Sequence, residues 1–118
     1  MSNIEDVTKR FLRDDWPVRL CNLASNLGRI QAIGDIDGKA STVDVVIDES
    51  LLFIECSLAD ASAGHARQLA DLKHELEHWK SDLDGLWSGP SSRAALCERA
   101  GEWCDALVAA SGLLTTAK

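Results

Sequence analysis

The sequence predicts an all-α protein, an up-and-down antiparallel bundle of four long helices plus a short N-terminal helix. Apolar residues recur at spacings of three and four over most of the 118 residues, which is the period of an amphipathic helix. The connections between these stretches are short, and short connections make consecutive long helices antiparallel neighbours. The length corresponds to one domain, so we expect residues 1–118 to form a single helical-bundle domain.

Two N-terminal helices are expected from their start signals. Ser2 and Glu5 form a capping box, which predicts a short first helix up to about Asp14. A proline is tolerated only in the first turn of a helix, so Pro17 predicts that a second helix begins there or at Trp16. The apolar stripe of this second helix, which stops before a turn rich in glycine and aspartate, comprises Leu20, Leu23, Leu27 and Ile30.

The third helix is expected over 41–59, with Ser41 as its N-cap. The β-branched residues of TVDVVI also fit a short strand, and this alternative stays open at the level of sequence. We favour a helix because one stripe keeps its phase through the whole segment, and because DES lacks the glycine or asparagine of a tight hairpin. The stripe comprises Val43, Ile47, Leu51, Ile54 and Leu58.

The two C-terminal helices carry the most regular stripes. SGPSS separates them, and Pro90 is well placed as the first residue of the last helix. The residues before the break are expected to form one continuous helix through Leu86. The first stripe comprises Leu69, Leu72, Leu76, Trp79, Leu83 and Leu86, and the second comprises Leu96, Ala100, Trp103, Leu107, Ala110 and Leu114.

Charge and composition exclude several classes of function. The formal net charge of −7 disfavours binding to nucleic acid or to an anionic membrane surface. The N-terminal residues show no apolar core of a secretory signal, and no apolar run is long enough to span a bilayer. The four cysteines lack metal-site spacing, so we expect reduced thiols and a cytoplasmic location.

The stretch HELEH contains the H-E-x-x-H spacing of zinc metalloproteases. Residues four apart lie on one helix face, so His74 and His78 can reach one metal while Glu75 acts as a general base. The phase of the helix argues against this site. At about 100° per residue, His74 lies roughly 170° and His78 roughly 130° from the apolar stripe. Both imidazoles are therefore expected to face solvent, and nothing in the sequence is predicted to cover that polar face.

The 41–59 helix carries a second apolar line nearly opposite its main stripe. A helix that is apolar on two faces must be covered on both. Either the short N-terminal helix covers the second face, or another subunit does, as a homodimer or with a partner protein. The candidate interface residues are Val45, Leu52, Phe53 and Cys56.

Several stretches, in the same order, resemble a group of small uncharacterised helical proteins common in cyanobacteria. These are NLASNLGRIQ, DESLLFIE, and a C-terminal run of Trp79, Trp87, Pro90, Arg93-Ala94-Ala95, Trp103 and SGLL. The resemblance spans about residues 22–114 and implies an all-helical chain. It implies no activity, cofactor or site residue.

The sequence therefore predicts a non-enzymatic protein that acts through protein–protein contact, with no catalytic residue, metal or cofactor. The alternative is a small zinc-binding or zinc-dependent hydrolytic protein that uses His74, Glu75 and His78.

Overall fold

The computed structural model describes residues 15–33, 40–59 and 61–111, and these residues form five helices. The described residues contain no strand, so the all-α class is confirmed and the strand alternative for 41–59 is wrong. The predicted N-terminal helix lies outside the described residues. The helices are α2 (Trp16–Ala32), α3 (Ala40–Leu58), α4 (Ala63–Ser81), α5 (Leu83–Ser88) and α6 (Pro90–Ser111).

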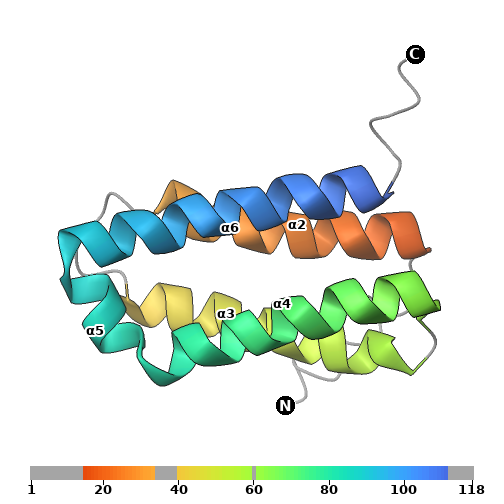
Figure 1. The fold of residues 1–118 in the computed structure, drawn as a ribbon, viewed down its shortest axis with the longest axis horizontal. Coiled ribbons are helices and arrows are strands. Elements are labelled where there is room, and N and C mark those ends of the chain that lie inside the picture. The colour runs from red at the N-terminus through yellow and green to blue at the C-terminus, as the bar shows by residue number, and fades with distance from the viewer. Residues whose placement is uncertain (1–14, 34–39, 60, 112–118) are drawn as a thin grey trace.

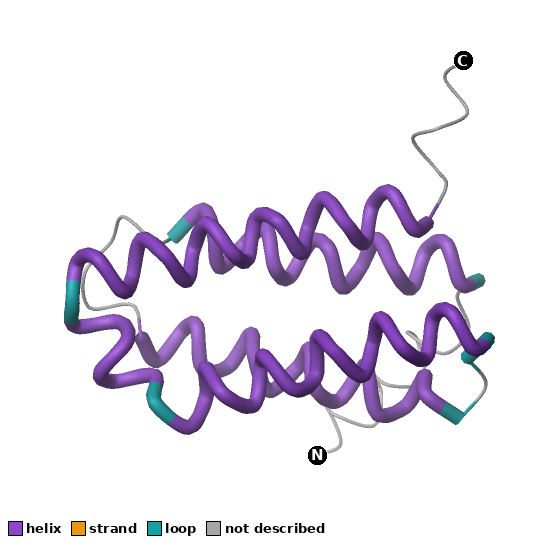
Figure 2. Tube along the Cα trace, in the orientation of Figure 1, coloured by secondary structure: helices purple, strands orange, loops and turns teal. Residues whose placement is uncertain are grey.

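The four long helices lie in two pairs. Helices α2 and α6 run side by side, and α3 and α4 form the second pair (Figures 1 and 2). Each long helix runs in the opposite direction to the long helix before it in the chain (Figure 1). The short helix α5 lies at one end, where it carries the chain from α4 to α6 (Figure 1). None of the described helices is both long and apolar enough to cross a lipid bilayer.

The helix starts follow the local sequence signals. Pro17 lies in the first turn of α2, and Pro90 is the first residue of α6, as predicted. The side chain of Ser62 caps α4, because its Oγ accepts a hydrogen bond of 3.2 Å from the backbone N–H of His65. Helix α3 begins at Ala40, so Ser41 lies inside the helix rather than at its cap.

The predicted continuous helix through Leu86 is wrong, because the chain breaks at Asp82. The backbone of Asp82 has φ −126° and ψ 26°, which ends α4 and begins α5. Gly85 follows within the first turn of α5, and glycine weakens a helix interior by about 0.5–1 kcal/mol. Trp87 on α5 lies in the core, where it is 2% exposed and its Nε1 has no hydrogen-bond partner among the described residues.

The core lies between the helices and is built from the predicted stripes. The four stripe residues of α2 are almost fully buried, and the stripes of α3, α4 and α6 face them. Ala110 is exposed, so the stripe of α6 is shorter than predicted, and Leu114 lies outside the described residues. The fully buried stripe residues of the other long helices are Val43, Ile47, Ile54, Leu69, Leu72, Leu76, Ala100 and Leu107.

Small residues line the contact between α2 and α6. Gly28 of α2 and Gly101 of α6 lie in this contact, and Ala24 and Ala100 of the same two helices are buried. A Cβ atom at Gly28 would lie 3.6 Å from Cys104 Sγ on the facing helix. Small side chains let two helix backbones approach closely, so this pair forms the tightest contact between elements in the described chain.

A buried polar contact joins α2 to α3. Asn26 is buried, and its Nδ2 donates hydrogen bonds of 3.1 Å to Ser50 Oγ and 3.1 Å to Glu49 Oε1. Ser50 Oγ in turn donates to the backbone carbonyl of Val46 at 2.8 Å. Arg29 Nη1 donates to Asn26 Oδ1 at 3.3 Å. Burying an amide is favourable only when it is paired, and here both ends of the Asn26 side chain have partners.

Candidate functional site

The outer face of α3 contains the four residues that the sequence nominates as an interface. Val45 is the most exposed large apolar side chain of the described residues, at 66%. Leu52 and Cys56 are half-buried, so part of each side chain reaches the surface. Phe53 is 7% exposed and belongs to the core cluster, so it offers little surface to a second chain. We therefore use the name outer face of α3 for the three residues Val45, Leu52 and Cys56.

A second surface feature lies between α4 and α6. An open hollow of about 530 Å³ separates the two helices. A smaller hollow of about 220 Å³ continues it toward α5, where the lining is more apolar. The larger hollow is lined by Asp71, His74, Glu75 and His78 from α4 and by Arg99 and Trp103 from α6. All three defining residues of the H-E-x-x-H motif therefore border one hollow.

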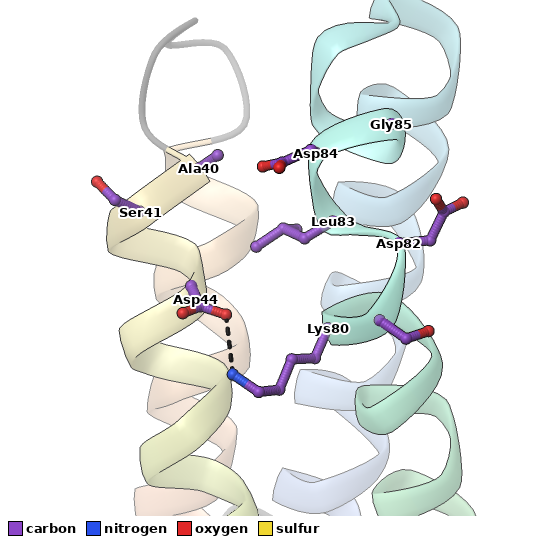
Figure 3. Close-up of a pocket in the computed structure, with 9 residues that line it drawn as sticks. Ala40, Ser41, Asp44, Lys80, Asp82, Leu83, Asp84 and Gly85 are labelled. Atoms are coloured by element: carbon purple, nitrogen blue, oxygen red, sulfur yellow. Dashed lines mark hydrogen bonds and ion pairs between the residues drawn. The ribbon is translucent and has the colours of Figure 1, made fainter.

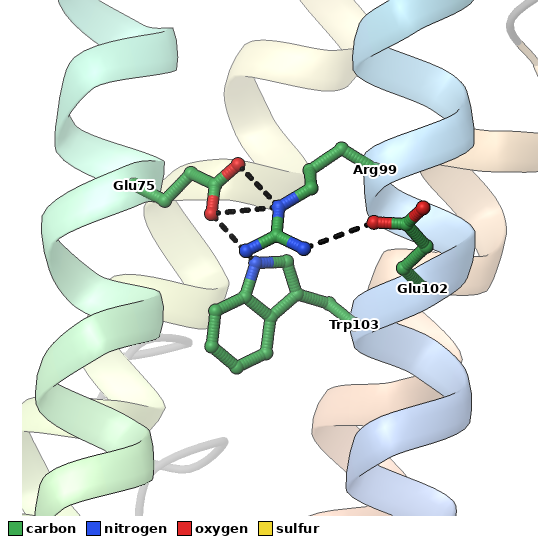
Figure 4. A network of polar contacts seen from close by, with 4 residues as sticks. All are labelled: Glu75, Arg99, Glu102 and Trp103. Atoms are coloured by element: carbon green, nitrogen blue, oxygen red, sulfur yellow. Dashed lines mark hydrogen bonds and ion pairs between the residues drawn. The ribbon is translucent and has the colours of Figure 1, made fainter.

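Glu75 is the centre of a polar network that spans this hollow (Figure 4). Arg99 Nε donates hydrogen bonds to its two carboxylate oxygens at 2.9 and 3.1 Å. Trp103 Nε1 donates to Glu75 Oε1 at 2.8 Å, and Arg99 Nη1 donates to Glu102 Oε1 at 2.9 Å. The guanidinium also lies over the Trp103 ring, 5.3 Å from its centroid. The hydrogen bonds to Glu75, and then to Glu102, raise the pKa of Arg99.

This network engages Glu75, the residue that would act as general base in the H-E-x-x-H motif. A base must be free to accept a proton from a metal-bound water. The Glu75 carboxylate instead accepts three hydrogen bonds from Arg99 and Trp103, one donor group being positively charged. The expectation that nothing covers the polar face of this helix is therefore wrong at Glu75, whose side chain is 23% exposed.

His74 and His78 are both exposed, as their phase on the helix predicts. Neither imidazole makes a hydrogen bond or an ion pair within the part of the chain that the structure describes. The described residues also contain no group of three or more His, Cys, Asp or Glu side chains placed to hold one metal ion. The third histidine, His65, is separate, because it stacks on Trp16 with 5.1 Å between the ring centroids.

A third hollow, of about 400 Å³, lies between the start of α3 and the corner of α4 and α5 (Figure 3). Lys80 reaches from α4 toward α3, where its Nζ lies 2.8 Å from Asp48 Oδ1 and 3.1 Å from Asp44 Oδ1. These hydrogen bonds raise the pKa of Lys80, so it remains charged and is a poor nucleophile. Both carboxylates and the ammonium are well exposed, and such pairs hold helices together only weakly.

Cys104 on α6 does not have the environment of an activated nucleophile. None of the four cysteines forms a disulfide with another. Burial, with further contributions from Asp105 and Cys21, raises the pKa of the Cys104 thiol. A raised pKa keeps the sulfur protonated, whereas a reactive cysteine needs a lowered one.

The geometry thus leaves two surfaces with a distinctive character, the outer face of α3 and the hollow between α4 and α6. Sequence reasoning nominated Val45, Leu52, Phe53 and Cys56 for the first surface, and it named His74, Glu75 and His78 of the second. It missed Arg99 and Trp103, whose spacing of four residues places them on one face of α6 and was the available signal. Comparisons with protein families, with curated proteins and with solved structures found no match to this chain.

Proposed function

We propose that this protein acts by protein–protein contact through the outer face of α3, and that its partner there is a second copy of the same chain. The observation that carries the proposal is Val45, whose apolar side chain is 66% exposed in the second turn of α3. Helix α3 is the most apolar of the four long helices, yet its Val45 side chain stays largely exposed in the described part of the chain. Covering such a face removes apolar area from water, which favours association.

The surroundings of the outer face support a contact between identical chains. Charged residues of both signs border it, because Asp44 and Asp48 pair with Lys80, and Glu55 lies 3.9 Å from Lys73. A twofold axis places the same patch against itself, so a border with both signs lets each cation meet an anion of the other copy. An apolar centre inside a polar rim is the usual anatomy of a protein interface.

The broader features of the proposal follow from the sequence. The four long helices form an up-and-down bundle within a single domain, and the location is cytoplasmic. The protein binds neither nucleic acid nor membranes. Zinc-dependent hydrolysis is the weaker alternative, because Glu75, the residue that would serve as its base, is held by Arg99 and Trp103.

Analytical ultracentrifugation over a range of protein concentrations tests this function. We expect the wild type to sediment as a dimer and Val45→Asp to sediment as a monomer with an unchanged helical circular dichroism spectrum. Leu52→Asp is a second variant on the same face. A charge placed in an apolar contact must be desolvated, so either variant should weaken the dimer strongly.

The matched control is Val18→Asp. Val18 is the other exposed large apolar side chain of the described residues, at 41%, and it lies on α2. This variant carries the same new charge outside the outer face of α3, so it should remain dimeric. A wild type that stays monomeric at every concentration would contradict the homodimer, and a dimer that survives Val45→Asp would place the contact elsewhere.

A further inference from the structure

We propose that His74 and His78 form an open two-imidazole site for a divalent transition-metal ion such as Ni²⁺ or Cu²⁺. The site goes beyond the proposed contact function and needs no catalysis. The two histidines are four residues apart on α4, which places their side chains one above the other on one helix face, with Cβ atoms about 5–6 Å apart. Two imidazole nitrogens at that spacing can bind one metal at the usual distance of about 2.0–2.1 Å.

The condition of the two side chains suits metal binding. Both are exposed and border the same 530 Å³ hollow, so an ion and its remaining waters have room. Neither imidazole is engaged by another described side chain, so binding displaces no existing hydrogen bond. Asp71 lies on the same hollow one turn before His74, and its carboxylate adds favourable charge.

The neighbouring network defines what kind of site this is. Glu75 would have to leave Arg99 and Trp103 to become a ligand, so the ion keeps only the two imidazoles and fills its other positions with water. No third protein ligand stands in position in the described residues. Such an open site differs from a closed structural zinc site, which has four protein ligands. Among divalent ions, those late in the Irving–Williams order, Ni²⁺ and Cu²⁺, should bind more tightly than Mn²⁺ or Fe²⁺.

The experiment is a calorimetric titration of tag-free protein with Ni²⁺ at pH 7.5. Nickel is the chosen probe because the cysteines of this chain, none of which forms a disulfide, would reduce or capture Cu²⁺. We expect one ion per chain. Loss of a group outside the coordination sphere already costs about 10–100-fold in metal affinity, so His74→Ala and His78→Ala should each weaken binding at least tenfold. Both residues are exposed, so both variants should fold.

The matched control is His65→Ala, because His65 is the remaining histidine and stacks on Trp16 away from the hollow. It should bind Ni²⁺ like the wild type. Metal ligands must be deprotonated, so binding should also weaken as the solution is made acidic. The proposal is wrong if His74→Ala and His78→Ala bind as tightly as the wild type, or if His65→Ala loses binding to the same extent.

Discussion

The carboxylate of Glu75 joins α4 to α6 across a surface hollow. It accepts hydrogen bonds from Arg99 Nε and Trp103 Nε1, and it lies opposite the positive charge of the guanidinium. Arg99 is about half exposed, so its charge contributes little to the free energy of folding. The indole N–H matters more, because Trp103 is buried and its donor has no other partner in the described residues.

Substitution of Glu75 separates these two contributions. Glu75→Ala should lower the free energy of unfolding by about 1–2 kcal/mol, because it leaves the Trp103 N–H without an acceptor. Glu75→Gln keeps an acceptor oxygen and should lower it less. Urea denaturation followed by circular dichroism measures both.

Glu102→Ala is the control for this prediction. It removes the other carboxylate partner of Arg99 without touching Trp103, so its effect should stay below about 0.5 kcal/mol. If Glu75→Ala and Glu102→Ala lower the free energy of unfolding equally, Glu75 stabilises the fold through its ion pair with Arg99 rather than through the indole hydrogen bond.

At the scale of the helix, the close contact of α2 with α6 depends on side chains that are small. Gly28 lies in the interior of α2, where glycine has an entropic disadvantage relative to alanine of about 0.5–1 kcal/mol. A Cβ atom at this position would lie 3.6 Å from Cys104 Sγ, which is an ordinary van der Waals contact. Space therefore exists for one methyl group at this position.

We expect Gly28→Ala to raise the free energy of unfolding by about 0.5–1 kcal/mol. Gly28→Val should lower it, because the extra carbons would meet the facing helix. Chemical denaturation of both variants tests the prediction, and a destabilised Gly28→Ala would contradict it.

Gly101→Ala is an informative comparison on the facing helix. There an added Cβ would collide with the side-chain amide of Gln31 unless that amide moves. Gln31 is exposed and flexible, so the gain should be smaller than at Gly28 rather than reversed.

The helices themselves were predictable from the sequence, and the breaks between them less so. Leu20, Leu23, Leu27 and Ile30 are all buried because the period of their spacing alone selects one helix face. The break at Asp82 was missed because Leu83 keeps the phase of the preceding stripe. When the apolar spacing continues unchanged from one helix into the next, the periodicity of the sequence does not reveal where the helix direction changes.

For the whole molecule, the pairing of helices determines which parts open last. Helices α2 and α6 are far apart in the sequence yet form the tightest contact. Opening either one therefore exposes the buried stripes of both. Helices α3 and α4 are joined by a short connection and pack less closely.

Native-state hydrogen exchange should consequently show the slowest amides in the central turns of α2 and α6. The amides of these two helices should also share one opening free energy, because neither remains packed when the other leaves. Exchange followed by NMR or mass spectrometry gives this measurement. Slowest exchange in α3 and α4 would contradict the prediction.

The candidate site could be predicted only in part, because it also depends on how the helices pack against each other in the whole molecule. The positions of His74 and His78 follow from helix phase, which is a local property. The partners of Glu75 follow from the placement of α6 beside α4, and sequence spacing within either helix does not specify which helices face each other. The burial of Phe53 was missed for the same reason, because the packing of the helices against each other decides which side chains of α3 are covered.

The hydrogen bonds of Asn26 affect the register of α3 along α2. An apolar stripe repeats from turn to turn, so hydrophobic contact alone would allow α3 to slide along α2 by one turn. Such a shift of about 5.4 Å would carry Ser50 and Glu49 away from the Asn26 amide. Arg29 lies on the same helix as Asn26 and would stay bound to its Oδ1, but the Nδ2 group would lose both acceptors. A buried donor without an acceptor costs about 1–3 kcal/mol, so the shifted alignment is penalised while the native one is not. One polar side chain in an apolar core thus selects a single register among several that would bury similar area.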